Sequence, residues 1–147
     1  MLFTLLRLGE FNEAKYTFAS YMDLVGASDI DNVDEPKHYD VNEILRRMGL
    51  ANETKEQFFS VCFAGTELYG HIYGDGKMAT IIMHMALNVV EEELQDDKEE
   101  DTGLDSGVVA RVYRVHGTAC GVYARQCKLL FLYTEARSFF FVLTRKK

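Results

Sequence analysis

The 147-residue chain contains no tryptophan, a single proline and only three cysteines. One proline leaves helices almost uninterrupted, and a hydrophobic content of 48% excludes an intrinsically disordered chain. The cysteines are odd in number, lie among apolar residues and lack metal-ligand spacing, so we interpret Cys62, Cys120 and Cys127 as reduced core thiols of a cytoplasmic protein. The length suits one domain, residues 1–147.

Motifs for catalysis and cofactor binding are also absent: there is no nucleophile elbow, no zinc-binding pair and no glycine-rich nucleotide fingerprint. Gly74 and Gly76 precede Lys77 as in a phosphate loop, but Met78 follows where a hydroxyl is needed, so we interpret this segment as a turn between helices. His84 is interpreted as a core or boundary residue. We therefore expect no catalytic residue, no cofactor and no metal, and the alternative is a fragment of a larger enzyme.

Negative charge is concentrated in one stretch. The formal net charge is -7, and Glu91–Asp101 holds eight of the 23 acidic residues and one of the 16 basic residues, which leaves fifteen of each sign elsewhere. A chain that is neutral apart from one acidic stretch is a poor nucleic-acid ligand, so we expect no nucleic-acid partner. We predict an acidic, solvated loop over residues 95–107, with a landing site for a basic partner segment as the alternative.

A stretch near the N-terminus predicts a turn followed by a helix with one small-and-aromatic face. A glycine provides the left-handed backbone conformation at which a preceding helix over residues 1–8 ends, and Asn12 can cap the helix that follows. The next residues recur at intervals of three and four, which places them on one helix face. That face needs a partner. The pattern consists of Gly9, Phe11, Ala14, Phe18 and Tyr21.

Later parts of the chain repeat these offsets. Gly65 and Gly117, inside the candidate first helices of the later copies, would let a neighbouring helix approach closely. A helix pair that cannot bury its own face is normally stacked on copies of itself, so the repetition predicts an all-α fold of antiparallel helix-turn-helix repeats with about five to seven helices. The second copy is Gly74, Gly76, Ala79, Met83 and Ala86, and a weaker third copy is Ala136, Phe140 and Leu143.

With about two and a half such units, the chain resembles the tetratricopeptide repeats, in which a glycine-aromatic turn joins two antiparallel helices. More narrowly, Tyr21–Val25, the insertion that follows it and Val109–Arg125 look like the family of the fungal cargo-transport protein and the animal tetratricopeptide repeat protein 7. The chain departs from the repeat pattern because no tryptophan opens a first helix, the second unit lacks the turn aromatic and no proline closes a unit.

The resemblance implies an α-solenoid fragment that acts as a non-catalytic scaffold. It would bind another protein by its concave or end surface and help to bring a phosphatidylinositol 4-kinase complex to the plasma membrane, with a role in trafficking or endocytosis. The repeat-like units would cover about 1–25, 54–95 and 107–144, with an insertion at 26–53.

Within the insertion, Asp40 and Glu43 resemble a capping box and predict a short helix over 41–48 that Gly49 ends. Arg46 and Arg47 are interpreted as favourable charges at the C-terminal end of this helix, with contact to an acidic partner or a lipid headgroup as the alternative. Further helices are predicted over 52–73 with Asn52 or Thr54 as cap, over 78–94 and over 108–126.

The last segment, 128–147, is strongly apolar, but Glu135 and Arg137 interrupt it and its apolar runs are too short to span a bilayer. We interpret it as the last repeat helix. The alternative is a peripheral membrane adaptor, in which the aromatic residues 139–141 and the basic residues 145–147 contact lipid.

Overall fold

The computed structural model describes residues 1–33, 37–96 and 105–145, without the side chains of 96, 133 and 135–145. The described chain is helical and contains no strand, which confirms the all-α prediction. The six α-helices are α1 (Leu2–Arg7), α2 (Phe11–Leu24), α3 (Val41–Leu50), α4 (Lys55–Thr66), α5 (Gly76–Asp96) and α6 (Ser106–Arg145), with the 3-10 turn η1 (Ile30–Asn32) and the π-helix η2 (Glu67–Ile72) between them.

The first helix pair, α1 and α2, forms around the predicted turn. Gly9 has a φ of 73°, the left-handed conformation that favours glycine. The predicted cap is wrong: α2 begins at Phe11, one residue before Asn12, after Glu10, whose side chain makes no capping hydrogen bond. Ala14 and Phe18 are buried, so the predicted face is the one that packs.

The insertion folds onto the body of the protein through α3 and the segment before it. Asp40 caps α3, its carboxylate accepting a hydrogen bond from the Glu43 backbone N–H at 3.3 Å. The predicted stop at Gly49 is wrong, because the helix continues to Leu50 and the chain turns at Asn52, which has a φ of 59°. The buried backbone N–H of Tyr39 donates to Asn88 Oδ1 at 3.0 Å, which fastens the insertion to α5.

Helices α4 and η2 form one continuous rod that precedes α5. Thr54, one of the two predicted caps, begins it and forms a reciprocal capping box with Gln57. The rod ends before Gly74, whose φ of 67° reverses the chain into α5. This glycine has the backbone conformation of Gly9, so the two predicted turns are locally alike.

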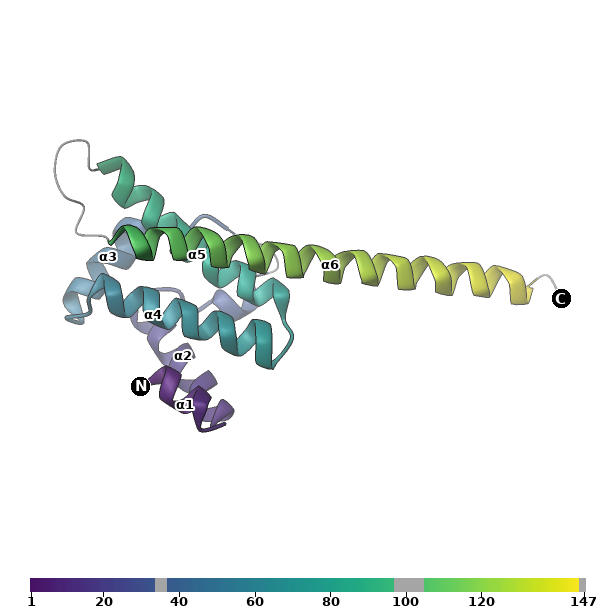
Figure 1. Ribbon diagram of the computed structural model, residues 1–147, viewed down its shortest axis with the longest axis horizontal. Coiled ribbons are helices and arrows are strands. Elements are labelled where there is room, and N and C mark those ends of the chain that lie inside the picture. Colours follow the sequence, from purple (N-terminus) through teal and green to yellow (C-terminus); the bar gives the residue numbers. More distant parts are fainter. Residues whose placement is uncertain (34–36, 97–104, 146–147) are drawn as a thin grey trace.

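Helix α5 is the centre of the molecule (Figure 1). It packs against α4 and η2 on one side, against α3 and η1 on another, and against α6. Every residue from Met78 to Val90 is buried except His84, which is half-buried. Burial on all sides follows from its composition, because a helix that is apolar around its circumference must be surrounded by other helices.

The two predicted C-terminal helices are one helix. The sequence placed a boundary near Cys127, but α6 runs without interruption from Ser106 to Arg145, a length of about 60 Å. No proline or glycine follows Gly121 to break it. The predicted unit 107–144 therefore contains no helix-helix turn, and the stacking of helix pairs into a solenoid stays a prediction.

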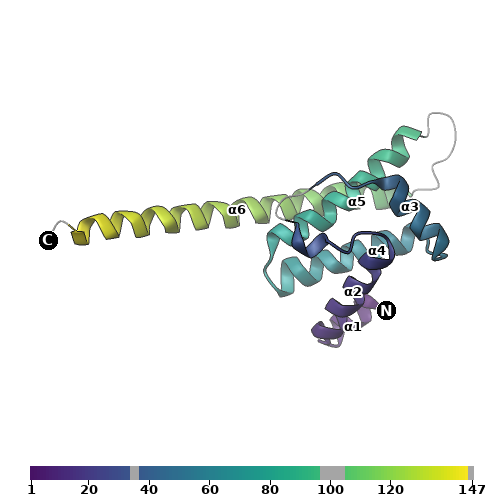
Figure 2. The same cartoon turned by 180° about the vertical axis from the view of Figure 1, so that it is seen from behind.

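The second half of α6 extends well beyond the other helices in both views (Figures 1 and 2). We call residues 127–145 the free half of α6. No helix in the described part of the chain is both long and apolar enough to cross a membrane.

Candidate binding surface along α6

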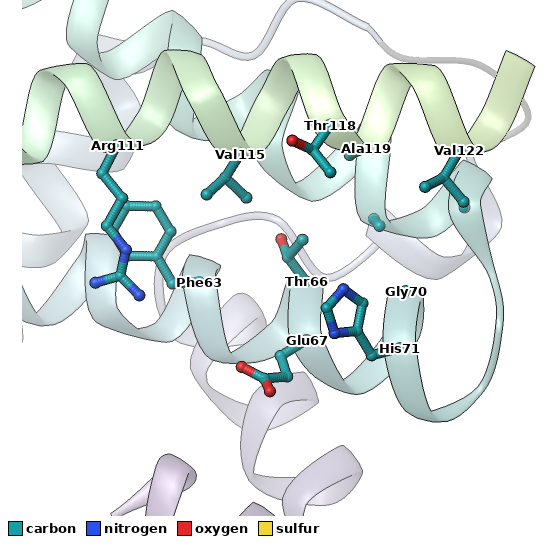
Figure 3. A pocket seen from close by; sticks show the side chains of 12 residues that line it. Phe63, Thr66, Glu67, Gly70, His71, Arg111, Val115, Thr118, Ala119 and Val122 are labelled. Carbon is teal, nitrogen blue, oxygen red and sulfur yellow. The ribbon is translucent and has the colours of Figure 1, made fainter.

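A pocket of about 200 Å³ lies where α4 and η2 face the first half of α6 (Figure 3). Its α6 wall combines the apolar side chains of Val115, Ala119 and Val122 with Arg111 and Thr118. The opposite wall adds Phe63 from α4 and the polar side chains of the helical rod. The polar lining from that wall consists of Thr66, Glu67 and His71.

Glycines bring the elements around the pocket into contact. A Cβ on Gly76 would lie 2.5 Å from Gln126 Oε1 and 3.1 Å from the Tyr123 backbone nitrogen, so the absence of a side chain at Gly76 lets α5 and α6 approach closely. The Gly76 N–H donates to Gln126 Oε1 at 3.0 Å, and Gln126 Nε2 donates to the Gly74 carbonyl at 2.8 Å. These two bonds fix the start of α5 to α6 at the end of the pocket where Val122 lies.

Arg111 lies at the other end of the pocket. Its guanidinium carbon is 4.0 Å from the centre of the Phe63 ring, a cation–π contact of about 0.5–2 kcal/mol. Among the described residues no hydrogen-bond acceptor or carboxylate pairs with this guanidinium. Its donors therefore face solvent at the rim of an apolar pocket, where they can bind an anionic group.

The π-helix η2 shapes the wall opposite α6. Such segments are rare, and single π turns inside helices occur frequently at functional sites. Gly70 permits this geometry against α5, because a Cβ there would meet the Ala79 Cβ at 3.2 Å. Glu67 and His71 are the exposed side chains that η2 contributes to the pocket, and neither was singled out from the sequence.

The free half of α6 carries a second apolar surface. Leu129, Leu130, Phe131 and Leu132 are 65%, 67%, 62% and 48% exposed. Since successive helix residues are rotated by about 100°, four consecutive residues cover all sides of the helix. This part of α6 is apolar around its whole circumference and is not covered by the described fold.

Two histidines meet between α5 and α6. The rings of His84 and His116 are 5.8 Å apart, and His116 Nε2 lies 3.6 Å from Cys120 Sγ. Burial and the neighbouring His84 lower the pKa of His116, while Glu91 raises it. No group of three or more candidate ligands able to hold a metal ion occurs in the described part of the chain. His84 is half-buried and therefore lies at the boundary of the core.

The residues predicted from the repeat pattern form a core where they lie on α2, α4 and α5. Phe18 packs on Gly65, where a Cβ would come within 2.3 Å of the ring, and meets Tyr69 edge to face at 5.7 Å. The predicted close approach at Gly65 is therefore confirmed. Phe11 is half-buried, and the fully buried members are Ala14, Phe18, Ala79, Met83 and Ala86.

The prediction for Gly117 is wrong. No atom lies within 4 Å of a Cβ built on it, because this glycine is on the solvent side of α6. Ala136 and Phe140 lie on the free half of α6, but their side chains are outside the described residues. The third predicted copy thus shares a helix with Gly117 without forming a helix pair.

Tyr21 lies at a second cavity of about 260 Å³ between the first helices and α4. Its hydroxyl is buried, with no hydrogen-bond partner among the described residues. Burial raises the pKa of Tyr21 well above its usual range, with a smaller contribution from Glu53. The cavity places this predicted core residue at a surface of the body instead of at its centre.

Comparison of the chain with protein-family models, with curated proteins and with solved structures found no match. The pocket was not predicted from the sequence. One signal could have indicated its α6 wall, because Val115, Val122 and Leu129 recur every seven residues beside an arginine-rich stripe.

Proposed function

We propose that the chain is a non-catalytic scaffold that binds another protein through α6. The observation that supports this is the free half of α6, whose four consecutive apolar residues are exposed on all sides of the helix. Burial of each would stabilise a complex by about 1.5–3 kcal/mol before the cost of association. A partner that surrounds this helix offers that burial, which the described fold does not.

Narrower parts of the proposal rest on the resemblance alone. These are a lipid-kinase complex as the partner, a cytoplasmic location with peripheral contact at the plasma membrane, and a role in trafficking. They are proposed as the first candidates to test.

Affinity purification of the tagged chain from cells, followed by mass spectrometry, tests the scaffold function. The test variant carries Leu130→Glu and Phe131→Glu on the free half. The matched control carries Tyr16→Glu and Leu50→Glu at two other exposed apolar positions, 74% and 75% exposed. We expect a specific protein with wild type and control that the test variant loses, and direct binding of that purified protein to the chain.

Recovery of chaperones alone, or of the same proteins with every variant, would contradict the scaffold function. Recovery of a lipid kinase and its membrane anchor with wild type and control would support the narrower assignment.

A peripheral membrane adaptor is the second candidate, because the exposed apolar side chains 129–132 adjoin Lys128 and the sequence ends in the basic residues 145–147. Sedimentation with anionic vesicles tests it. Loss of binding when Arg145, Lys146 and Lys147 are replaced by glutamine would support the adaptor, and absence of binding by wild type would remove it.

A further inference from the structure

One face of α6 continues from the pocket into the free half. Val115 and Val122 line the pocket, and Leu129 follows Val122 by seven residues. Seven residues turn a helix by nearly two full turns, so Leu129 lies within about 20° of Val122 around the axis. The pocket and the exposed Leu129 therefore form one surface, about 21 Å long from Val115 to Leu129.

This surface is basic along one edge. Residues 106–134 contain no acidic residue, and Arg114 and Arg125 are exposed beside the line from Val115 to Leu129. The net charge of the rest of the chain has the opposite sign. Residues 1–105 carry 22 acidic and eight basic residues, a net charge of -14, whereas 106–147 carry eight basic residues and one acidic residue, a net charge of +7.

The pocket admits a small group. Its volume of about 200 Å³ is below the roughly 300–1,000 Å³ of small-molecule sites, so it suits one large apolar side chain. The carboxylate of Glu67 on the opposite wall repels an acidic group of a ligand from that side of the pocket. A ligand with negative charge is therefore oriented with that charge towards Arg114 and Arg125.

We propose that an amphipathic helix of a partner protein, acidic along one flank, docks lengthwise on this face of α6. One apolar anchor fills the pocket, the next turns cover Leu129, and the acidic flank pairs with Arg114 and Arg125. This is recognition of a helix in a groove, with anchors at helical spacing. It rests on the scaffold function proposed above and names the chemistry of the partner.

Two other occupants fit the structure less well. A bilayer cannot enter a concave pocket. A second copy of the chain would have to supply an acidic helix to this face. Its acidic residues 91–93 are on α5, which is already packed against the α6 of the same copy. No free acidic helix is present in the described parts of a second copy.

The probe is a designed helical peptide of about 16 residues, with leucine along one face and glutamate elsewhere. Its counterpart has lysine at every glutamate position. Fluorescence anisotropy with the complete chain measures binding of each labelled peptide. We expect the acidic peptide to bind at least about tenfold more tightly than the lysine peptide, a difference that shrinks as salt is added.

Variants locate the bound peptide. Thr118→Tyr fills the pocket from its exposed rim, and Ala124→Tyr adds the same side chain on the opposite side of α6. We expect Thr118→Tyr to weaken the acidic peptide about tenfold and Ala124→Tyr to leave it unchanged. Arg114→Glu with Arg125→Glu should weaken it by a similar factor, while Arg7→Glu on α1 should not. Circular dichroism melting confirms that each variant is folded.

Equal binding of both peptides, or full binding to Thr118→Tyr, would overturn the inference. Two further results would overturn it. A dimer in sedimentation velocity that Thr118→Tyr dissociates would assign the face to a second copy, and vesicle binding that Thr118→Tyr abolishes would assign it to lipid. This inference can fail while the scaffold function holds. If a cellular partner is lost with Leu130→Glu and Phe131→Glu but kept with Thr118→Tyr, the scaffold function is supported and only the docking inference is wrong.

Discussion

Helices α5 and α6 are the two longest in the protein and are both rich in apolar residues, but their surroundings differ. Between Met78 and Val90, α5 exposes only part of His84, whereas α6 buries a narrow stripe around Val112 and Ala119 and then leaves the other helices. Apolar content alone therefore does not determine burial in this molecule. The two helices differ in how many of their sides are covered by other elements. Other helices surround α5, whereas no element of the described fold covers the free half of α6.

The largest expected effect compares one apolar position on each helix. Met83→Asp places an unpaired carboxylate at a fully buried site of α5, so we expect a loss of at least about 4 kcal/mol in the free energy of unfolding. Leu130→Asp on α6 should change it by no more than about 0.5 kcal/mol, because that side chain already contacts solvent.

Urea unfolding followed by circular dichroism measures both values. A large loss of stability with Leu130→Asp would show that the free half is covered in solution, by a second copy or by folding back, and would remove the contrast between the two helices.

The second prediction compares two helix glycines, Gly65 and Gly117. A Cβ on Gly65 would overlap the Phe18 ring at 2.3 Å, so Gly65→Ala should cost about 1–3 kcal/mol. Gly117→Ala meets no atom within 4 Å and should stabilise the helix by about 0.5–1 kcal/mol. Thermal melting should therefore shift in opposite directions.

Phe18→Leu tests whether the Gly65 effect acts through this ring. In the Phe18→Leu background, Gly65→Ala should lose part of its cost, because the smaller side chain removes the overlap. If the two changes add without interaction, or if both alanine variants raise the melting temperature, the contact assigned to Gly65 is wrong.

These glycines also show how far the sequence determines the structure. The turns at Gly9 and Gly74 and the burial of Ala14 and Phe18 follow from local spacing, since they depend on neighbouring residues and on one helix face. Gly65 and Gly117 have similar sequence contexts, but whether a neighbour approaches depends on tertiary packing. Their difference could not be predicted locally.

The continuity of α6 and the pocket were missed for related reasons. The repeat pattern favoured a helix boundary near Cys127, but residues 122–134 contain no helix breaker, and local propensity prevails. The pocket depends on the π-helix geometry at Gly70 and on the angle at which α6 crosses the rod. Periodicity indicates which residues share a face and does not give the space between two faces.

The smallest expected effect concerns the interface between α5 and α6, where His116 faces His84 and Cys120, with Glu91 nearby. Burial and His84 lower the pKa of His116 in the folded protein, against a smaller opposite effect of Glu91. The unfolded chain therefore binds more protons at mildly acidic pH. The stabilising contribution is present above about pH 6.5 and is lost as the pH falls through the lower folded pKa.

His116→Gln should make urea unfolding less sensitive to pH between about 7.5 and 5.5. Glu91→Gln should increase that sensitivity, because the carboxylate is the group that favours protonated His116. The same pH dependence in wild type and His116→Gln would mean that this pair does not link protonation to packing of α6.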